Sequence, residues 1–502
     1  RLRREAAEYY RAHRVPQRME EALNALFPLR PADLYGELAN YFSKFSRAPV
    51  VCKLAGRKVL DGVGQPTLEV EIYCTVKNYE KRICSAIISS HYQIPENAFS
   101  EATEADERER NDSVTTAVEW VNESLSAMLR DLKPTDQCEI DKMLGTCFKA
   151  VKYLATILCL AGKKSSTEIT IPPAEPSESV LCGSLAIGGT SLAIAKAGAS
   201  INHVPLYLHI ALLKRSQDSP KEMTLPLPMV TLLSYEKLSP AKLKLMKEVM
   251  LIPPVQLSLK QGIERALDIQ KEMMRLLEPA GKAPPALNGV SHLGCLITGC
   301  DNLEQPLLLI QTACNNIGLE LGTDMYLAIN CAAHELMDYV KGKYEILTGT
   351  FRSPDEMVDM YVELVNKFPS IIALVDPLRK EDRQQWNNMC CALGSKCYLI
   401  AEDAATNSSK LKTDHNINIP MCSGVVLKYV NQTKVSDLIE LTGLLDGQRR
   451  ITILGSPDGE SSDDSLVDLA VGLGARFVKL GGLSRGERVT KYNRLLAIEE
   501  EL

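Results

Sequence analysis

The sequence predicts an α/β protein that ends in a (β/α)8 barrel, with an N-terminal α+β capping domain before the barrel and a short helical module before that domain. Three observations support this prediction. The chain has 502 residues, more than one ordinary domain requires. Short β-rich runs alternate with helical patterns through its C-terminal half, and residues 1–45 show a helical periodicity of their own.

Residues 1–45 carry the apolar and proline spacing of two amphipathic helices, the first opened at Val15-Pro16 and the second preceded by Pro31. Helices this short cannot bury both faces alone, so the pattern implies a partner. The stretch resembles the docking and dimerisation domain of the type II regulatory subunit of protein kinase A. That resemblance implies a homodimer whose groove takes an amphipathic helix of an anchoring or flagellar protein. A helical hairpin that lies on the protein's own body is the alternative.

Residues 48–223 alternate as strands and then show helical spacing. Strands are predicted at 50–54, 57–60 and 68–76, with a glycine turn before the last. The apolar residues between Val118 and Leu132 recur at helical spacing. We therefore expect an antiparallel sheet with helices on one face, an insertion near 162–178, and a helix of small residues after Gly183.

Residues 224–502 alternate strand and helix at the spacing of a barrel. The predicted strands are 326–329, 371–375, 397–401, 424–427, 451–454 and 476–478. Such alternation implies parallel pairing and a closed barrel. An open, doubly wound sheet is the alternative, although no glycine-rich nucleotide-binding motif stands in the right context. The stretch 279–290 is predicted to be a solvent loop.

Composition excludes several functional classes. The formal net charge is −6 with a pI near 5.8, and no basic run dominates, so neither nucleic acid nor a membrane surface is an expected partner. The 15 cysteines lack paired CxxC spacing, which indicates reduced core thiols. No signal peptide is visible, and the apolar runs are too short to span a bilayer.

The last stretch of the chain draws attention to Lys479. A short apolar strand delivers this lysine to its C-terminal end, Gly481 and Gly482 turn the chain, and a charged amphipathic helix follows. The carboxyl ends of strands are where (β/α) barrels place their chemistry. Taken alone, a solvated loop lysine is the alternative interpretation.

Several segments together resemble the enolase family. They are Leu60-Asp-Gly-Val-Gly-Gln-Pro-Thr, Leu225-Pro-Leu-Pro, Met246-Lys-Glu-Val-Met-Leu-Ile-Pro, and the closing segment through Ile498-Glu-Glu-Glu-Leu. The resemblance covers residues 48–502. Together with the module in front, it points to a divergent sperm branch of the family, which implies a cytoplasmic homodimer of the sperm flagellum.

The resemblance implies Mg²⁺-dependent dehydration of 2-phosphoglycerate to phosphoenolpyruvate. Lys428, after the predicted strand 424–427, matches the base that takes the α-proton. Lys479 matches the second lysine, which contacts the substrate carboxylate, and Glu248 matches an acid that binds substrate and assists hydroxyl departure. We expect a dry barrel mouth and a neighbouring cation to depress the pKa of a lysine base.

The positions that the resemblance assigns to the metal are mostly changed. They hold Asn330, Val375 and Glu402, so only one of the three is an anion. Mg²⁺ depends on carboxylate oxygens, and binding is expected to be much weaker. Asp376 and Asp403, one residue further on, could substitute, but they would point to the opposite face if their strands continued through them.

Other positions that differ from the family pattern also predict a weakened site. Leu293 stands where a second acid is expected, and Leu238 where a histidine is expected. The phosphate-holding segment is replaced by Gly455-Ser-Pro-Asp458, which lacks cationic donors. The closing lid is the stiffer segment Ser89-Ser-His-Tyr-Gln-Ile-Pro95.

Three functions remain open at this point. The protein is an active lyase that kept its base, a structural pseudoenzyme that dimerises and anchors, or a sensor that binds a phosphorylated or carboxylated metabolite between Lys428 and Lys479. Metal and phosphate contacts supply most of the electrostatic and positioning energy of such a reaction. We therefore expect weak or absent turnover.

Overall fold

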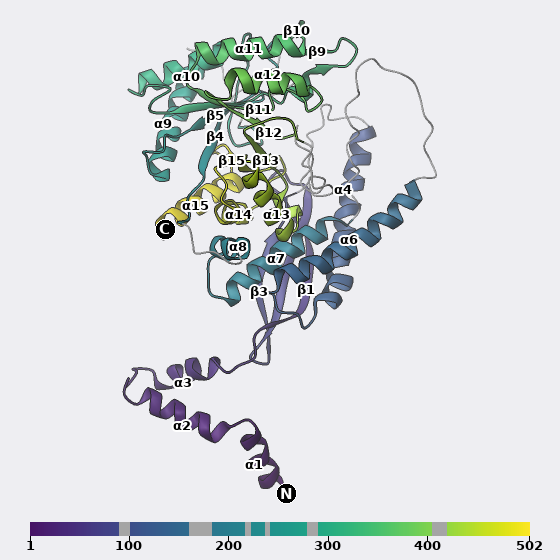
Figure 1. Ribbon diagram of the computed structural model, residues 1–502, viewed down its shortest axis with the longest axis vertical. Coiled ribbons are helices and arrows are strands. Elements are labelled where there is room, and N and C mark those ends of the chain that lie inside the picture. The colour runs from purple at the N-terminus through teal and green to yellow at the C-terminus, as the bar shows by residue number, and fades with distance from the viewer. Residues whose placement is uncertain (90–100, 160–182, 216–221, 236–240, 279–289, 404–418) are drawn as a thin grey trace.

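The chain forms an N-terminal group of helices, a sheet with helices packed on it, and a barrel (Figure 1). The computed structural model describes residues 1–89, 101–159, 183–215, 222–235, 241–278, 290–403 and 419–502. The predicted insertion near 162–178 and most of the predicted loop 279–290 lie outside these residues. Among the described helices, none combines the length and apolar character that a bilayer crossing requires.

The N-terminal module contains three helices where the sequence predicted two. They are α1 (Leu2–Ala12), α2 (Val15–Leu26) and α3 (Leu34–Ser43). The break between α1 and α2 falls at Arg14, whose backbone is left-handed and cannot continue a helix. Pro16 lies in the first turn of α2, where its missing N–H costs nothing. Asp33 caps α3 by accepting the Gly36 N–H at 2.9 Å.

The second part is an antiparallel sheet with helices packed on it, as predicted. Its strands, in the order β1-β2-β3, are β1 (Val50–Leu60), β2 (Pro66–Val76) and β3 (Tyr79–Ile87). Its helices are α4 (Glu101–Trp120), α5 (Ser126–Leu129), α6 (Gln137–Cys159), α7 (Leu185–Ile201) and α8 (Leu206–Lys214), and a π-helical turn (Val121–Leu125) joins α4 to α5. Helices α4 and α7 contact the sheet directly.

Helix α7 is buried along most of its length because it also meets the barrel. Its small residues permit that approach. A Cβ added at Gly188 would lie 2.1 Å from the backbone of Gln432, which belongs to the barrel. The predicted helix of small residues thus packs at the interface between the cap and the barrel.

Eight strands close into the barrel. They are β4 (Leu227–Ser234), β5 (Glu248–Ile252), β7 (Tyr326–Asn330), β11 (Ile371–Val375), β12 (Tyr398–Ala401), β13 (Gly424–Leu427), β14 (Ile451–Gly455) and β15 (Phe477–Gly481). Strand β15 pairs with β4, which closes the ring and excludes the open sheet. The two-residue strand β6 (Leu296–Ile297) joins β4 at the edge.

One strand corrects the prediction of uniform parallel pairing. Strand β5 runs antiparallel to both β4 and β7. The chain returns from β4 to β5 through residues 235–247, which hold no helix where they are described. Without a crossover helix, the returning strand pairs antiparallel. The first residue of β5 therefore lies at the same end of the barrel as the last residues of its neighbours.

Helices surround the barrel and an apolar cluster fills it. The helices are α9 (Leu259–Leu277), α10 (Gln305–Asn316), α11 (Pro354–Lys367), α12 (Arg383–Leu393), α13 (Val435–Gly447), α14 (Ser465–Leu473) and α15 (Gly486–Glu501). A small antiparallel sheet contains β8 (Met337–Asp338), β9 (Lys343–Leu347) and β10 (Thr350–Arg352). The interior cluster includes Met250, Val375, Ile453 and Phe477, all nearly inaccessible to solvent. The barrel is a packed core, so its polar chemistry is confined to its mouth.

Candidate active site at the barrel mouth

Four polar side chains named from the sequence meet at the mouth of the barrel. Glu248 begins β5, Glu402 follows β12, Lys428 follows β13, and Lys479 is the third residue of β15. Lys479 Nζ lies 3.1 Å from Glu248 Oε1 and 3.4 Å from Glu402 Oε1. Lys428 Nζ lies 3.3 Å from the other Glu402 oxygen. The four groups form one continuous row of alternating charge.

This pairing reverses the expected pKa of the lysines. Burial alone lowers the pKa of Lys428, but Glu402 and Asp403 outweigh it and raise the pKa well above its ordinary value. Burial likewise lowers the pKa of Lys479, and Glu248 and Glu402 raise it by more. The expectation of a depressed lysine pKa is wrong, because the flanking carboxylates stabilise the ammonium form.

Glu248 is held as a carboxylate by its surroundings. Its side chain is buried, which raises its pKa, but Lys479 and Lys247 outweigh burial and lower the pKa to about 2. Thr231 Oγ1 donates to one oxygen at 3.0 Å, and Asn330 Nδ2 donates to the other at 3.1 Å. Every one of these donors fixes Glu248 as an ionised acceptor.

The residues at the family's metal positions do not fit Mg²⁺. Val375 is fully buried in the apolar cluster that fills the barrel. Asn330 gives its amide N–H to Glu248, and its Oδ1 accepts the Ala332 N–H at 3.2 Å. Both oxygens of Glu402 face lysines. Mg²⁺ prefers carboxylate oxygens in octahedral array, and this arrangement offers one carboxylate already neutralised by ammonium groups.

Asp376 and Asp403 do not point to the opposite face, as a continuing strand would require. Strand β11 ends at Val375, and Asp376 has a positive φ of 46°, so the chain turns there. The Asp376 oxygens accept the N–H groups of Glu402 and Asp403, both at 2.8 Å. Burial, followed by the Asp403 charge, raises the pKa of Asp376 to about 6. Both carboxylates remain at the mouth, beside His334.

The segment at the phosphate position presents an acid. Burial raises the pKa of Asp458, but His292, Lys247 and Lys428 outweigh burial and lower it below its ordinary value. His292 Nε2 lies 3.7 Å from Asp458 Oδ1. The charges of Lys247 and Lys428, which a bound phosphate would need, therefore act on Asp458 instead.

The other changed positions are structural where they are described. Leu293 is buried, and its carbonyl accepts the Gly482 N–H at 2.7 Å, which fixes the turn after β15. Gly482 has no room for a side chain, because a Cβ would lie 2.1 Å from the Gly294 carbonyl oxygen. Ser89 donates to Glu460 at 2.8 Å. Leu238 and the rest of the segment through Pro95 lie outside the described residues.

Sequence reasoning missed four charged or titratable residues at the mouth, namely Lys247, His292, His334 and Glu335. Lys247 lies 3.0 Å from Glu335, while His292 and His334 face Asp458 and Asp403. Lys247, His292 and His334 each stand one to four residues from a position that the family resemblance singled out. Inspection of the neighbours of those positions could have revealed them. With them, the acids Glu248, Glu335, Asp376, Glu402, Asp403 and Asp458 outnumber the lysines 247, 428 and 479. An anionic substrate therefore meets a mouth with an excess of negative charge.

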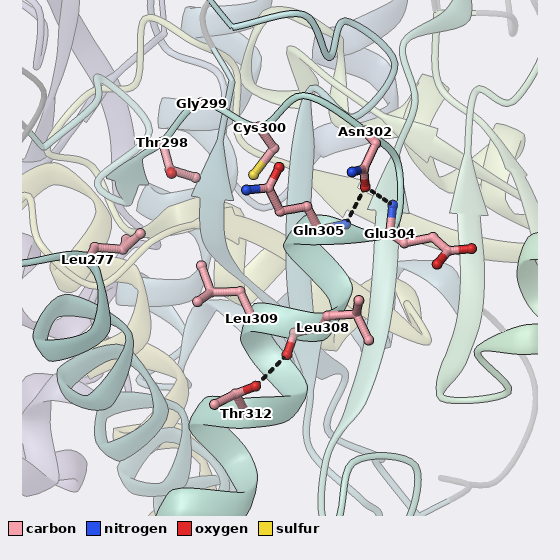
Figure 2. Close-up of a pocket in the computed structure, with 10 residues that line it drawn as sticks. All are labelled: Leu277, Thr298, Gly299, Cys300, Asn302, Glu304, Gln305, Leu308, Leu309 and Thr312. Carbon is pink, nitrogen blue, oxygen red and sulfur yellow. Dashed lines mark hydrogen bonds between the residues drawn. The ribbon is translucent and has the colours of Figure 1, made fainter.

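A separate hollow of about 520 Å³ lies between the end of α9 and the start of α10 (Figure 2). Asn302 Oδ1 accepts the N–H groups of Glu304 and Gln305, at 3.1 and 2.9 Å, and so caps α10. Thr298, Leu308 and Thr312 also line it. Among the described residues that line it, Glu304 is the one that carries a charge, and it pairs with Lys367. This hollow offers no constellation of acids and bases comparable with the mouth.

The α+β cap, the closed barrel with one antiparallel strand and the acids and lysines at its mouth define the class of (β/α)8 barrels whose strand ends carry an enzyme-type site. Residues 222–502 match the family model described as the enolase C-terminal TIM barrel domain. The chain belongs to the enolase family.

Relatives match along the whole chain. Enolase 4 of Homo sapiens is 50% identical over 550 residues, which cover 100% of this chain and 88% of the relative. Enolase 4 of Xenopus laevis is 50% identical and covered over 92% of its length, and Enolase 4 of Mus musculus is 48% identical and covered over 89%. Members of the family generally use Mg²⁺, which the residues at the corresponding positions here do not fit.

Proposed function

We propose that this enolase-family protein dehydrates 2-phosphoglycerate weakly or not at all, and that it works as a dimeric, anchoring structural protein. One observation supports the proposal of weak or absent turnover. Lys428 forms an ion pair with Glu402, and Lys479 forms one with Glu248. A lysine base must be neutral to accept a proton, and the carboxylates favour its charged form. The reaction also needs positive charge beside the developing enolate, and here that charge is already neutralised.

The phosphate position supports the same conclusion. A substrate phosphate would approach Asp458, whose carboxylate is held ionised by the neighbouring cations. Two anions brought together in a partly buried site repel, so binding would cost free energy before any chemistry. The metabolite-sensor alternative meets the same repulsion, whereas a structural function does not depend on this pocket.

The N-terminal module supports dimerisation and anchoring. Leu23 and Phe27 of the α2 segment are 57% and 72% exposed, and Tyr35 of α3 is 83% exposed. Helices of 10 to 12 residues hold their structure in water poorly when apolar faces stay uncovered. A second copy of the module, with an amphipathic helix of an anchoring protein in the shared groove, would cover these side chains. By the resemblance to the sperm branch, that anchor belongs to the flagellum.

The catalytic half is tested by turnover. The purified full chain is mixed with 2-phosphoglycerate and excess Mg²⁺, and phosphoenolpyruvate is measured against a glycolytic enolase at equal concentration. We expect a rate at least roughly a thousandfold lower, since losing a metal and a phosphate clamp removes several kcal/mol of transition-state stabilisation. Rapid turnover that Lys428→Ala abolishes would sink the proposal. Calorimetric titration with the same substrate tests the sensor alternative.

The anchoring half is tested by the module. Leu23→Ser with Phe27→Ser should abolish self-association through the module and capture of an amphipathic anchoring helix. The matched control is Leu212→Ser on α8, which removes an equally exposed apolar side chain (57%) from the body. Deleting residues 1–45 should leave the unfolding temperature of the body unchanged. Capture that survives the paired substitution would contradict the assignment.

A further inference from the structure

Three metal-ligating side chains gather at the mouth outside the family's metal positions. His334 lies in a short 3-10 helix (Ala333–Leu336) after β7, Asp376 follows β11, and Asp403 follows β12 by two residues. Strands β7, β11 and β12 are neighbours in the barrel, so their loops adjoin. One ligand atom from each side chain lies within 4.8 Å of the other two.

The donor atoms suit a cation. His334 Nε2 lies 3.2 Å from Asp403 Oδ2, and Nδ1 lies 3.8 Å from Asp376 Oδ2. His334 binds an ion through one ring nitrogen at a time, and one nitrogen and one oxygen of each aspartate lie within 4.8 Å of one another. Ligand atoms about 2.0–2.2 Å from one ion are about 3 to 4 Å apart, so side-chain rotation completes the geometry. Asp376 is 1% exposed, and each of its oxygens keeps a second lone pair beyond the backbone N–H that it accepts.

An orphaned atom points into the same space. His334 Nδ1 is buried and has no hydrogen-bond partner in the described part of the chain. A buried imidazole nitrogen left unpaired costs free energy that a ligand or a bonding partner would recover. On the other side, the Asp403 side chain is 46% exposed, which leaves a path for an ion and room for water ligands.

We propose that His334, Asp376 and Asp403 form a site for a divalent first-row transition-metal ion of the Mn²⁺ to Zn²⁺ class. The imidazole nitrogen decides the class, because nitrogen donors favour these ions over Mg²⁺. The ligands come from the loops after the same strands that carry Asn330, Val375 and Glu402, but from residues further along the chain. The site is thus displaced outward from the barrel core, and it does not depend on whether the protein turns over substrate.

A bound ion would change the mouth in one further way. Lys428 Nζ lies 3.9 Å from Asp403 Oδ2 and 3.3 Å from Glu402 Oε2. A dication on Asp403 would repel this ammonium group toward Glu402. The new site would therefore strengthen the pairing of Lys428 with Glu402.

The test titrates the full-length chain with Mn²⁺ and follows free Mn²⁺ by electron paramagnetic resonance. Mn²⁺ is chosen because Cys138 and Cys391 are exposed, and thiols would take Zn²⁺ indiscriminately. We expect one saturable site per chain that Zn²⁺ displaces and that a tenfold excess of Mg²⁺ does not. His334→Ala and Asp403→Asn should each weaken binding by at least tenfold. His292→Ala is the matched control and should leave affinity unchanged.

Absence of a saturable site would overturn the proposal, as would equal competition by Mg²⁺ or an affinity that neither variant changes. Both variants alter partly exposed side chains, and circular dichroism with thermal unfolding checks that they fold. Asp403→Asn provides an independent test if His334→Ala is unstable. Turnover of 2-phosphoglycerate in the earlier assay would defeat the proposed function and leave this site standing, so the two can fail separately.

Discussion

The two sides of the barrel mouth have changed to different degrees. The lysine side keeps Lys428 and Lys479 at the strand ends where the family places them. The opposite side holds Asn330 and Val375 at the positions that the resemblance assigns to the metal, and a segment that ends in Asp458 at the position it assigns to the phosphate. Lys428 and Lys479 are the counter-ions of Glu402 and Glu248. The lysines named from the family resemblance thus contribute to the electrostatic balance of the mouth, whichever function the protein has.

Placing carboxylates at positions 330 and 375 should have the largest effect on the free energy of unfolding. Asn330→Asp combined with Val375→Glu puts two more carboxylates beside Glu248 and Glu402, one of them in the apolar interior. Without metal we expect a loss of about 5 kcal/mol in the free energy of unfolding. Mg²⁺ should raise the unfolding temperature of this variant with concentration and leave the wild type unchanged. Equal Mg²⁺ responses would mean that the original positions still bind the ion.

Removing Lys479 should lower the free energy of unfolding somewhat less than the Asn330→Asp and Val375→Glu pair does. Lys479→Ala leaves two buried carboxylates without their shared cation, so we expect a loss of about 4 kcal/mol by urea unfolding. Lys479→Met with Glu248→Gln removes both members of the pair and should recover part of that loss. A lysine poised for catalysis would behave differently, since its removal commonly stabilises a protein. An increase in stability on Lys479→Ala would therefore restore the active-lyase hypothesis.

Lowering the pH should weaken the ion pair between Glu248 and Lys479, because Glu248 becomes protonated. The folded-state pKa of Glu248 is about 2, below its ordinary value of 4.5, so its contribution is present above pH 4.5 and is lost as pH falls toward 2. This shift corresponds to about 3 kcal/mol. Glu248→Gln should flatten the stability curve in this window. A variant curve parallel to the wild type would show that Glu248 titrates normally.

The smallest effect is expected for an exposed pair of the same chemistry. Lys367 Nζ lies 2.6 Å from Glu304 Oε1, closer than the lysines at the mouth, but the side chains are 56% and 42% exposed. Lys367→Ala should change unfolding free energy by less than about 1 kcal/mol, because water screens the pair. Comparable losses for Lys367→Ala and Lys479→Ala would show that burial does not distinguish these contacts.

Local patterns predicted most of the fold. The strands at 371–375 and 424–427 were placed at their observed bounds, because short β-branched runs between loops are a local signal. The strands β4 and β5 were not among those predicted. The antiparallel course of β5 was missed as well, because direction depends on whether the connecting segment contains a crossover helix. Helix α1 was missed because its separation from α2 depends on a left-handed backbone turn at Arg14.

The site shows where local reasoning stops. The positions of Lys428, Lys479 and Glu402 at one end of the barrel were predictable from strand ends. Glu248, which begins the antiparallel strand β5, was indicated by the family resemblance alone. The raised lysine pKa values were not, since Lys479 meets a carboxylate 231 residues away in sequence. The gathering of His334 with Asp376 and Asp403 depends on a left-handed residue at position 376, which periodicity alone cannot reveal.

Asn330 constrains the evolutionary route by which this barrel could regain a family-type metal centre. Its amide N–H binds Glu248 at 3.1 Å, so a reversion to aspartate alone would set one carboxylate against another. A reversion of Val375 alone would place an unpaired acid in the apolar interior. Each single reversion lowers the free energy of unfolding, and a metal ion would stabilise the fold only once both carboxylates are present. Selection would therefore remove the single-reversion intermediates. On the proposed loss of the family's metal, this barrel could therefore not regain it one substitution at a time.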